Sequence, residues 1–169
     1  MIHLVTGGAR AGKSGFVLAQ AEAVPGPIHF VATAEARDAD MAARIARHQA
    51  ERGARYHTVE APMRLPLALG ELGAGGAVVV DCLTMWVANH VLAGASEAEL
   101  ATQVDALCEA LRAQSRPTWV VTNEVGLGIV PDNALARRFR DELGRCNQRV
   151  AAISTRVSLL VAGIPVSVR

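Results

Sequence analysis

Short apolar runs alternate along the chain with longer stretches in which apolar residues return at helical spacing. The apolar runs predict strands at Ile2–Thr6, Ile28–Ala32, Tyr56–Glu60, Ala77–Asp81, Thr118–Thr122 and Val157–Ala162, the last being the final strand of the chain. The longer stretches predict helices at Lys13–Ala23, Asp38–Arg52, Leu65–Leu72, Ser96–Ala113 and Asp132–Ile153. Ser96 and Glu99 have the spacing of a capping box, which supports a helix start there.

This alternation is typical of an α/β fold with a mostly parallel central sheet and helices on both of its faces. No repeat or linker divides the sequence, so residues 1–169 are expected to form a single domain. Ligands of such sheets bind at the carboxyl ends of the strands. We therefore expect the segments that follow the strands to converge: Gly7–Ser14, Thr33-Ala34, Asp81-Cys82 and Asn123-Glu124.

Composition excludes several classes of protein. The 169 residues carry a formal net charge of +1, which gives no long-range attraction to nucleic acid or to a membrane surface. No apolar run is long enough to span a bilayer, and the N-terminus does not have the pattern of a signal peptide. Cys82, Cys108 and Cys146 are too scattered for a disulfide framework and are expected to be small buried residues. We expect a cytoplasmic protein without a nucleic-acid partner.

The first predicted strand is followed by a glycine-rich segment that matches the phosphate-loop pattern G-x-x-x-x-G-K-S. Its residues are Gly7, Gly8, Ala9, Arg10, Ala11, Gly12, Lys13 and Ser14. Glycines let successive N–H groups turn toward phosphate oxygens, and the start of the next helix adds positive potential. Beside sixteen arginines the chain has a single lysine, Lys13, where a compact ammonium reaches the β- and γ-phosphates. The pattern predicts a P-loop NTPase-like fold; a plain glycine-rich turn is the alternative.

A nucleotide-binding P-loop also needs an acid for its metal ion. Val78–Asp81 is an apolar strand segment that ends in a carboxylate, as a Walker-B strand does. We therefore expect the Ser14 hydroxyl and the Asp81 carboxylate to hold Mg²⁺, directly or through water. The alternative is that Asp81 only caps the segment that follows it.

Five blocks of the sequence are more particular than the phosphate loop alone. They read VTGGARAGKS, ATAEARDADMAARIARHQAERG, VVVDCLTMWVANH, VTNEVGLGIVPDNALARRFRDELGRCNQRVA and VAGIPVSV. In this order they resemble the bifunctional adenosylcobinamide kinase/adenosylcobinamide-phosphate guanylyltransferases, and they span nearly the whole chain. The resemblance implies two activities in cobalamin biosynthesis and salvage. One phosphorylates adenosylcobinamide with ATP or GTP, and the other transfers GMP from GTP to the resulting phosphate through a guanylylated histidine.

The RIARHQAER block contains one histidine, so the resemblance assigns the guanylylated position to His48. Arg44, Arg47 and Arg52 stand within four positions of it in the sequence. Nearby cations disfavour the imidazolium, which leaves the neutral imidazole that a nucleophile requires. On spacing alone, a solvated basic helix face with a half-buried histidine is the simpler interpretation.

The resemblance also implies further nucleotide-binding positions. They are Ala32, Thr33, Ala34, Gln49, Ala50, Glu51, Arg52 and Glu60. Glu60 is chemically suited to the guanine base, because a carboxylate accepts hydrogen bonds from both N1–H and N2–H₂. An ordinary acid at a strand end is an equal alternative for Glu60. Asn123 and Glu124 are candidates for positioning the substrate or the metal ion.

Three arginines and three histidines elsewhere in the sequence have fewer features that point to a function. Arg137, Arg138 and Arg140 are candidates for the corrinoid's phosphate, with an exposed basic helix as the safer interpretation. His3 and His29 are expected in or beside core strands and His90 on a helix surface, all without chemistry.

The resemblance implies a homotrimer with sites near the subunit contacts. Two other classes of function stay open. One is a P-loop kinase of a small metabolite that lacks nucleotidyl transfer, and the other is a nucleotide-dependent switch protein. Labelling of His48 by GTP separates the first from the main hypothesis, and dependence of turnover on cobinamide separates the second.

Overall fold

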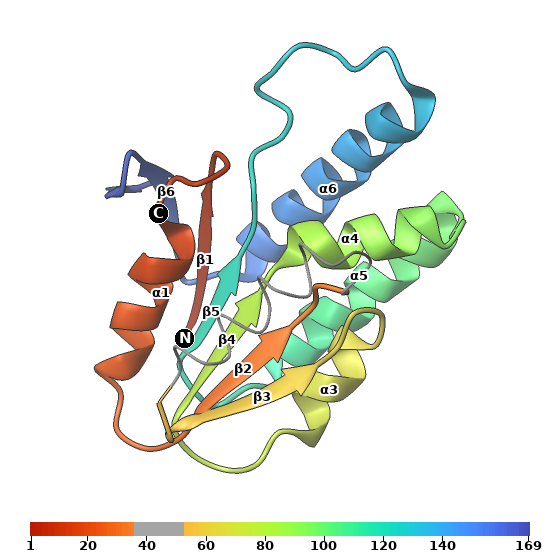
Figure 1. Cartoon of the computed structure of the whole chain (residues 1–169). Helices are drawn as coiled ribbons and strands as arrows, with labels where there is room; N and C mark the ends of the chain where they lie inside the picture. Colours follow the sequence, from red (N-terminus) through yellow and green to blue (C-terminus); the bar gives the residue numbers. More distant parts are fainter. Residues whose placement is uncertain (36–52) are drawn as a thin grey trace.

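The computed structural model describes residues 1–35 and 53–169, so the predicted helix Asp38–Arg52 lies outside the described residues. The strands are β1 (Ile2–Gly7), β2 (Ile28–Ala32), β3 (Tyr56–Glu60), β4 (Ala77–Asp81), β5 (Thr118–Val121), β6 (Arg156–Val161) and β7 (Ile164–Ser167). The helices are α1 (Lys13–Glu22), α3 (Leu65–Glu71), α4 (Leu83–Leu92), α5 (Glu97–Arg112) and α6 (Ala134–Ile153). Figure 1 shows their arrangement around one central sheet.

The strands form a sheet in the order β3-β2-β4-β5-β1-β6-β7. All neighbouring pairs are parallel except β6 and β7, which are antiparallel. The expected α/β fold with a mostly parallel sheet is thereby confirmed. The expectation that β6 is the final strand is wrong, because Ala162 and Gly163 form a tight turn with positive φ angles and the chain returns as β7. Pro165 is tolerated there because β7 is an edge strand.

Two apolar cores cover the two faces of the sheet. On one face, Val17 and Ala21 of α1 pack with side chains such as Phe30 and Val79. On the other face, α3, α4, α5 and α6 bury a larger core that includes Trp86 and Leu143. Full burial of one such aliphatic or aromatic side chain contributes about 1.5–3 kcal/mol. None of the helices in the described part of the chain has the length and apolar content needed to cross a membrane.

Helix α4 was also not predicted by the apolar pattern. It follows Asp81 and Cys82 directly, and its residues are apolar around most of the helix. A helix buried between a sheet and another helix lacks a polar stripe, so the helical period is hidden. By contrast, α5 begins at the predicted capping box: the Ser96 hydroxyl accepts a hydrogen bond from the Glu99 N–H, and the Glu99 carboxylate accepts one from the Ser96 N–H.

The connections that follow β1 and β5 diverge at the carboxyl end of the sheet. The segment after β1 leads to α1 on one face, whereas the segment after the adjacent β5 leads to α6 on the opposite face. Adjacent strands whose connections diverge in this way leave an opening where ligands bind. Figure 1 shows the long segment between β5 and α6 projecting beyond this edge of the sheet.

Candidate nucleotide site

The loop between β1 and α1 holds a buried ammonium. Lys13 Nζ donates to the carbonyl oxygens of Gly8 at 2.6 Å and Gly7 at 3.2 Å. Lys13 is only 8% exposed, and burial lowers its pKa below the 10.5 of an ordinary lysine, an effect partly opposed by Cys82 and Asp81. An ammonium has three donors, so it can bind a phosphate oxygen while it keeps both carbonyls.

Two glycines of this loop are required by close main-chain contacts. Gly7 has φ +152°, and a Cβ atom there would lie 2.6 Å from the carbonyl oxygen of Leu160 in β6. Gly12 has φ +89°, and a Cβ atom there would lie 3.2 Å from Gly163 Cα in the β6–β7 turn. The Gly163 N–H also donates to the Ala11 carbonyl at 3.0 Å. The hairpin formed by β6 and β7 therefore supports the loop, whose intervening residues Ala9 and Arg10 stay exposed.

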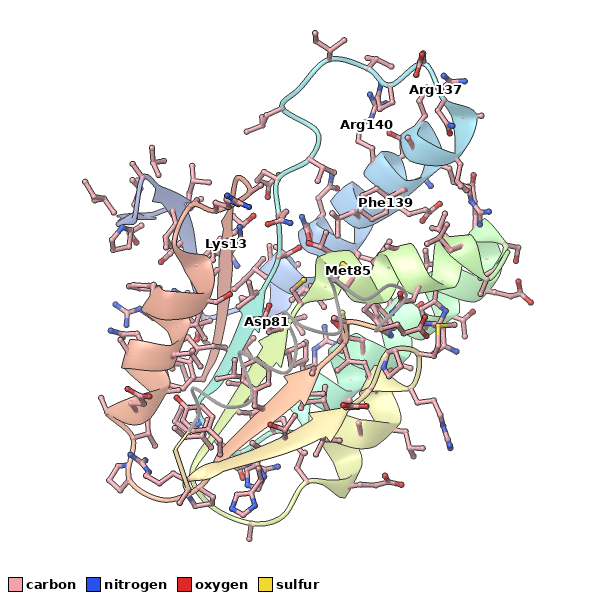
Figure 2. The ribbon with its side chains drawn as sticks, viewed as in Figure 1. Lys13, Asp81, Met85, Arg137, Phe139 and Arg140 are labelled. Atoms are coloured by element: carbon pink, nitrogen blue, oxygen red, sulfur yellow. The ribbon has the colours of Figure 1, made fainter. Side chains whose placement is uncertain are left out.

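The predicted metal ligands lie next to each other although Ser14 begins the helix after β1 and Asp81 ends β4, a strand that is not a neighbour of β1. Ser14 Oγ donates to Asp81 Oδ2 at 3.2 Å, and β5 lies between β1 and β4 in the sheet. Figure 2 shows Lys13 and Asp81 near the same end of the sheet. An exposed hydroxyl and a half-buried carboxylate fit Mg²⁺, which takes few protein ligands and completes its shell with phosphate oxygens and water.

Three residues predicted to serve the nucleotide share one level of the sheet. Ala32 is in register with Glu60 of β3 on one side and with Asp81 of β4 on the other. In-register residues of adjacent strands present their side chains on the same face. Ala32 packs with the core under α1, so Glu60 and Asp81 belong to the face that carries the phosphate loop. Glu60 is exposed there, at the end of an edge strand.

Thr33 joins the segment after β2 to the start of α4. Its side chain is fully buried, and Oγ1 accepts from the Cys82 N–H at 2.8 Å and donates to the Cys82 carbonyl at 2.6 Å. Ala34 follows, half-buried. Asp81-Cys82 and Thr33-Ala34 thus converge as predicted. Burial, with a smaller effect of the Asp81 charge, raises the pKa of the Cys82 thiol to about 11, which keeps it protonated at neutral pH.

The segment after β5 also reaches the phosphate loop. Thr6 Oγ1 donates to Glu124 Oε1 at 2.8 Å, and the Glu124 N–H donates to the Gly7 carbonyl at 3.3 Å. Asn147 of α6 supports this segment from below, since its Nδ2 donates to the Asn123 carbonyl at 3.0 Å. The fourth predicted segment therefore joins the other three at the carboxyl edge of the sheet.

Several residues that the sequence singled out lie away from this edge or outside the described part of the chain. His48, Gln49, Ala50, Glu51 and Arg52 lie outside the described residues. The three candidate arginines in the first turns of α6 each have a partner within the protein: Arg137 donates to the Pro131 and Asp132 carbonyls, Arg138 to the Ala95 carbonyl, and Arg140 to Asp141. Figure 2 shows Arg137 and Arg140 on α6, away from Lys13.

The buried histidines and cysteines are mostly where the sequence predicted them. His3 and His29 are buried in β1 and β2, and Cys108 and Cys146 are buried in the helices. The expectation for His90 is wrong, because it is only 7% exposed and its ring packs edge-on against Trp86 in α4. Its two partners, Trp86 one turn earlier in α4 and the Met63 carbonyl after β3, are brought to it by α4, a helix that the apolar pattern did not predict.

With this geometry in view, comparisons with known proteins decide the family. The sequence model of the family described as "Cobinamide kinase / cobinamide phosphate guanyltransferase" matches residues 3–168. The chain belongs to this family. The resemblance found in the sequence is therefore confirmed.

Relatives match the chain over its whole length. It is 39% identical over 170 residues to the bifunctional adenosylcobalamin biosynthesis protein CobP of Pseudomonas aeruginosa, covering 100% of this chain and 98% of that protein. It is 38% identical over 185 residues to CobU of Salmonella typhimurium, with both chains covered fully. A solved Pyrococcus horikoshii protein, Project ID PH0250, superposes with a TM-score of 0.58 over 98% of this chain and 84% of that one. At 9% identity, that likeness concerns the fold alone.

Proposed function

We propose that the chain performs both reactions of its family in cobalamin biosynthesis. It phosphorylates the hydroxyl of the aminopropanol arm of adenosylcobinamide, and it transfers GMP from GTP to adenosylcobinamide phosphate. The observation that carries this proposal is the buried Lys13 ammonium, seated on two loop carbonyls beside the Ser14–Asp81 pair, in a chain that matches the family from residue 3 to residue 168.

For the kinase step, the residues of the phosphate loop position the triphosphate. The loop N–H groups and the start of α1 bind the phosphate oxygens, and Lys13 stabilises charge on the transferred phosphoryl group. Ser14 and Asp81 would hold Mg²⁺, which neutralises phosphate charge when bound. Because Lys13 is already placed by Gly7 and Gly8, little reorganisation is needed when the substrate arrives.

For the transfer step, we propose His48 as the nucleophile. An imidazole nitrogen forms a bond to the α-phosphorus of GTP while the bond to the bridging oxygen breaks and pyrophosphate leaves with the electron pair. An oxygen of the corrinoid phosphate then attacks the same phosphorus, and the P–N bond breaks, returning its electrons to the imidazole. Two displacements of moderate difficulty replace one difficult displacement.

We propose Glu60 as the acceptor for the guanine base. Its exposure at the end of β3, on the face that carries Ser14 and Asp81, supports this role. Ala32, Thr33 and Ala34 would line the path between phosphates and base. The family resemblance adds four further residues to the proposed nucleotide site: Gln49, Ala50, Glu51 and Arg52.

The proposal extends to a homo-oligomer, a trimer by family pattern, in the cytoplasm where its nucleotides are supplied. Apolar side chains that face solvent in a single subunit support an association. In the segment after β5, Leu127 is 84% and Ile129 is 96% exposed, and Ile164 of β7 is also exposed. Large exposed apolar side chains that gather on a surface mark contact sites. Light scattering of the purified chain measures the oligomeric state directly.

The central experiment follows the α-phosphate of GTP. The wild-type chain is incubated with GTP radiolabelled at that position, and we expect acid-labile, base-stable label on the protein. His48→Ala should abolish the label and GMP transfer while leaving phosphorylation of cobinamide. Wild-type protein that phosphorylates cobinamide without taking the label would instead be a simple kinase. Triphosphate turnover that ignores added cobinamide would indicate a switch protein.

A further inference from the structure

One face of α4 holds the main chain at the ends of β2 and β3. Asn89 Nδ2 donates to the Thr33 carbonyl at 2.8 Å and to the Pro62 carbonyl at 3.0 Å. Trp86 Nε1 donates to the Met63 carbonyl at 3.1 Å, and His90 Nε2 lies 3.2 Å from the same oxygen. Asn89 and His90 come three and four positions after Trp86, so all three lie on one side of the helix.

Asn89 is the member of this group that reaches both segments. It is 1% exposed and lies among Trp86, Val87 and Val91, which belong to the apolar core. Burial of an amide in such surroundings costs free energy unless its donors are satisfied. An apolar residue of similar size would serve a helix core at least as well. An amide at this position is therefore explained by the main-chain carbonyls after β2 and β3 that it binds, and not by the packing of α4.

The segments that Asn89 joins carry the proposed base site. Thr33 follows Ala32 directly, and Pro62 comes two residues after Glu60. Between them, the Ala61 N–H donates to the Ala32 carbonyl at 2.7 Å. An edge strand has a neighbour on one side only, so its end needs a further support to hold a fixed position. Asn89 supplies this support from the opposite face of the sheet.

We propose that Asn89 is a positioning residue for recognition of the guanine base. Its amide fixes the ends of β2 and β3 relative to each other, and thereby keeps the Glu60 carboxylate where N1–H and N2–H₂ of guanine can both be bound. This role rests on the proposed use of GTP and on Glu60 as acceptor. The phosphate loop has a separate support, because β6 and the β6–β7 turn contact it directly.

The chain contains a matched control on the other side of the sheet edge. Asn147 of α6 is also a buried asparagine, and its Nδ2 donates to a main-chain carbonyl just after a strand, that of Asn123. Its side-chain oxygen accepts from Thr122 Oγ1 at 2.7 Å. Asn147 therefore supports the segment after β5, and the two hydrogen bonds of its side chain are to residues of that segment and not to the ends of β2 or β3. Loss of either amide should destabilise the fold similarly, but only Asn89 should affect the base.

The test compares the binding of GDP with that of IDP, which lacks the 2-amino group of guanine. Dissociation constants are measured by calorimetry for the wild-type chain, Asn89→Leu and Asn147→Leu, after circular dichroism has shown that each variant is folded. Wild type should prefer GDP by on the order of tenfold or more, as expected for one hydrogen bond to a charged group. Asn89→Leu should bring this preference close to one, and Asn147→Leu should preserve it. Binding of inorganic tripolyphosphate, which has no base, should change less than about twofold in Asn89→Leu.

Several outcomes would overturn the proposal. They are a folded Asn89→Leu with the wild-type preference, an equal loss of preference in Asn147→Leu, or a wild-type chain that does not distinguish GDP from IDP. If Asn89→Leu does not fold, Asn89→Ser, which keeps one donor, is measured in the same way and should show a partial loss. The readout is nucleotide binding and not catalysis. A chain that binds GDP but fails to transfer GMP would therefore refute the proposed function, while the binding preference would still test the role of Asn89.

Discussion

The carboxyl edge of the sheet has two parts, which we name after the proposed nucleotide: a phosphate side, formed by the ends of β1, β4, β5 and β6, and a base side, formed by the ends of β2 and β3. On the phosphate side, main chain contacts main chain: the Gly163 N–H donates to the Ala11 carbonyl, and Gly7 lies against the Leu160 carbonyl. On the base side, side chains of α4 hold the main chain: Trp86 and Asn89 both donate to carbonyl oxygens there.

The difference matches the two parts of a nucleotide. A triphosphate is the same whatever its base, and main-chain N–H groups recognise it through backbone shape alone. A base is recognised by the pattern of donors and acceptors on its edge, which requires a side chain held at a fixed position. The phosphate side therefore depends on glycines, and the base side depends on polar side chains buried beneath it.

The largest expected effect comes from removing the ammonium of the phosphate side. Lys13→Ala should lower kcat/KM of both proposed reactions by on the order of 100- to 1,000-fold, as loss of one preorganised donor does elsewhere. Steady-state assays of cobinamide phosphorylation and GMP transfer would show this. Lys13→Arg should not restore activity, because the forked guanidinium does not fit the space between the Gly7 and Gly8 carbonyls. Normal turnover in Lys13→Ala would contradict the proposed function as a whole.

The next effect tests the main-chain contacts. Gly7→Ala would place Cβ 2.6 Å from the Leu160 carbonyl oxygen, so either β6 or the loop must move. We expect a loss of about 1–3 kcal/mol in the free energy of unfolding, with weaker tripolyphosphate binding. Gly8→Ala is the matched control, since a Cβ atom at Gly8 meets nothing within 4 Å. Equal unfolding free energies for the two variants would show that the β6 contact does not constrain the loop.

A smaller effect concerns acid and the base side. Burial lowers the pKa of His90 below the 6.5 of an ordinary histidine, although its hydrogen bond to the Met63 carbonyl opposes this. The unfolded chain then binds the proton more readily, so stability is complete above pH 6.5 and is lost as the pH falls through that value. Each unit of lowering corresponds to about 1.4 kcal/mol. Urea unfolding at about pH 7.5 and about pH 5.5, in buffers of equal ionic strength, should show this loss of stability.

His90→Gln separates the base side from the rest. His3, near the amino end of β1, also has a lowered pKa, through burial and through Arg156, so the variant should keep part of the acid sensitivity. A variant with the full wild-type difference between the two pH values would show that His90 contributes nothing. A smaller change in unfolding free energy between the two pH values than in the wild-type chain would assign the lost part to His90 in α4.

The phosphate side was more predictable from the sequence than the base side. The loop pattern and the apolar run ending in Asp81 predicted the neighbourhood of Lys13, Ser14 and Asp81, because each belongs to a local motif. The contacts of Thr33 and Asn89 join residues far apart in the sequence, and no local pattern reports such pairs. Helix α4, which carries Asn89, was itself not predicted, because a helix that is apolar on most sides shows no helical period in its sequence.

The β6–β7 hairpin shows the same limit on the phosphate side. Its turn at Ala162 and Gly163 and the alternation that follows have the form of a hairpin, which the prediction of a final strand at Val157–Ala162 passed over. Neither the hairpin pattern nor the phosphate-loop pattern predicts that this turn contacts the phosphate loop. Local chemistry was therefore predictable, whereas the supports that hold it in place came from tertiary structure.

The smallest expected effect is a change in protonation when phosphate binds. Because burial lowers the pKa of Lys13, its ammonium in the free protein loses the proton at a lower pH than an ordinary lysine does. A bound phosphate favours the ammonium, so binding should draw a fraction of one proton from the buffer, and affinity should fall as the pH rises through the lowered pKa. Calorimetry of tripolyphosphate binding near pH 9, in buffers of different ionisation enthalpy, measures this uptake. In Asn89→Leu the uptake should equal that of the wild-type chain, because the hydrogen bonds of Asn89 go to the Thr33 and Pro62 carbonyls and not to the phosphate loop. A change in the uptake would show that the two sides are coupled.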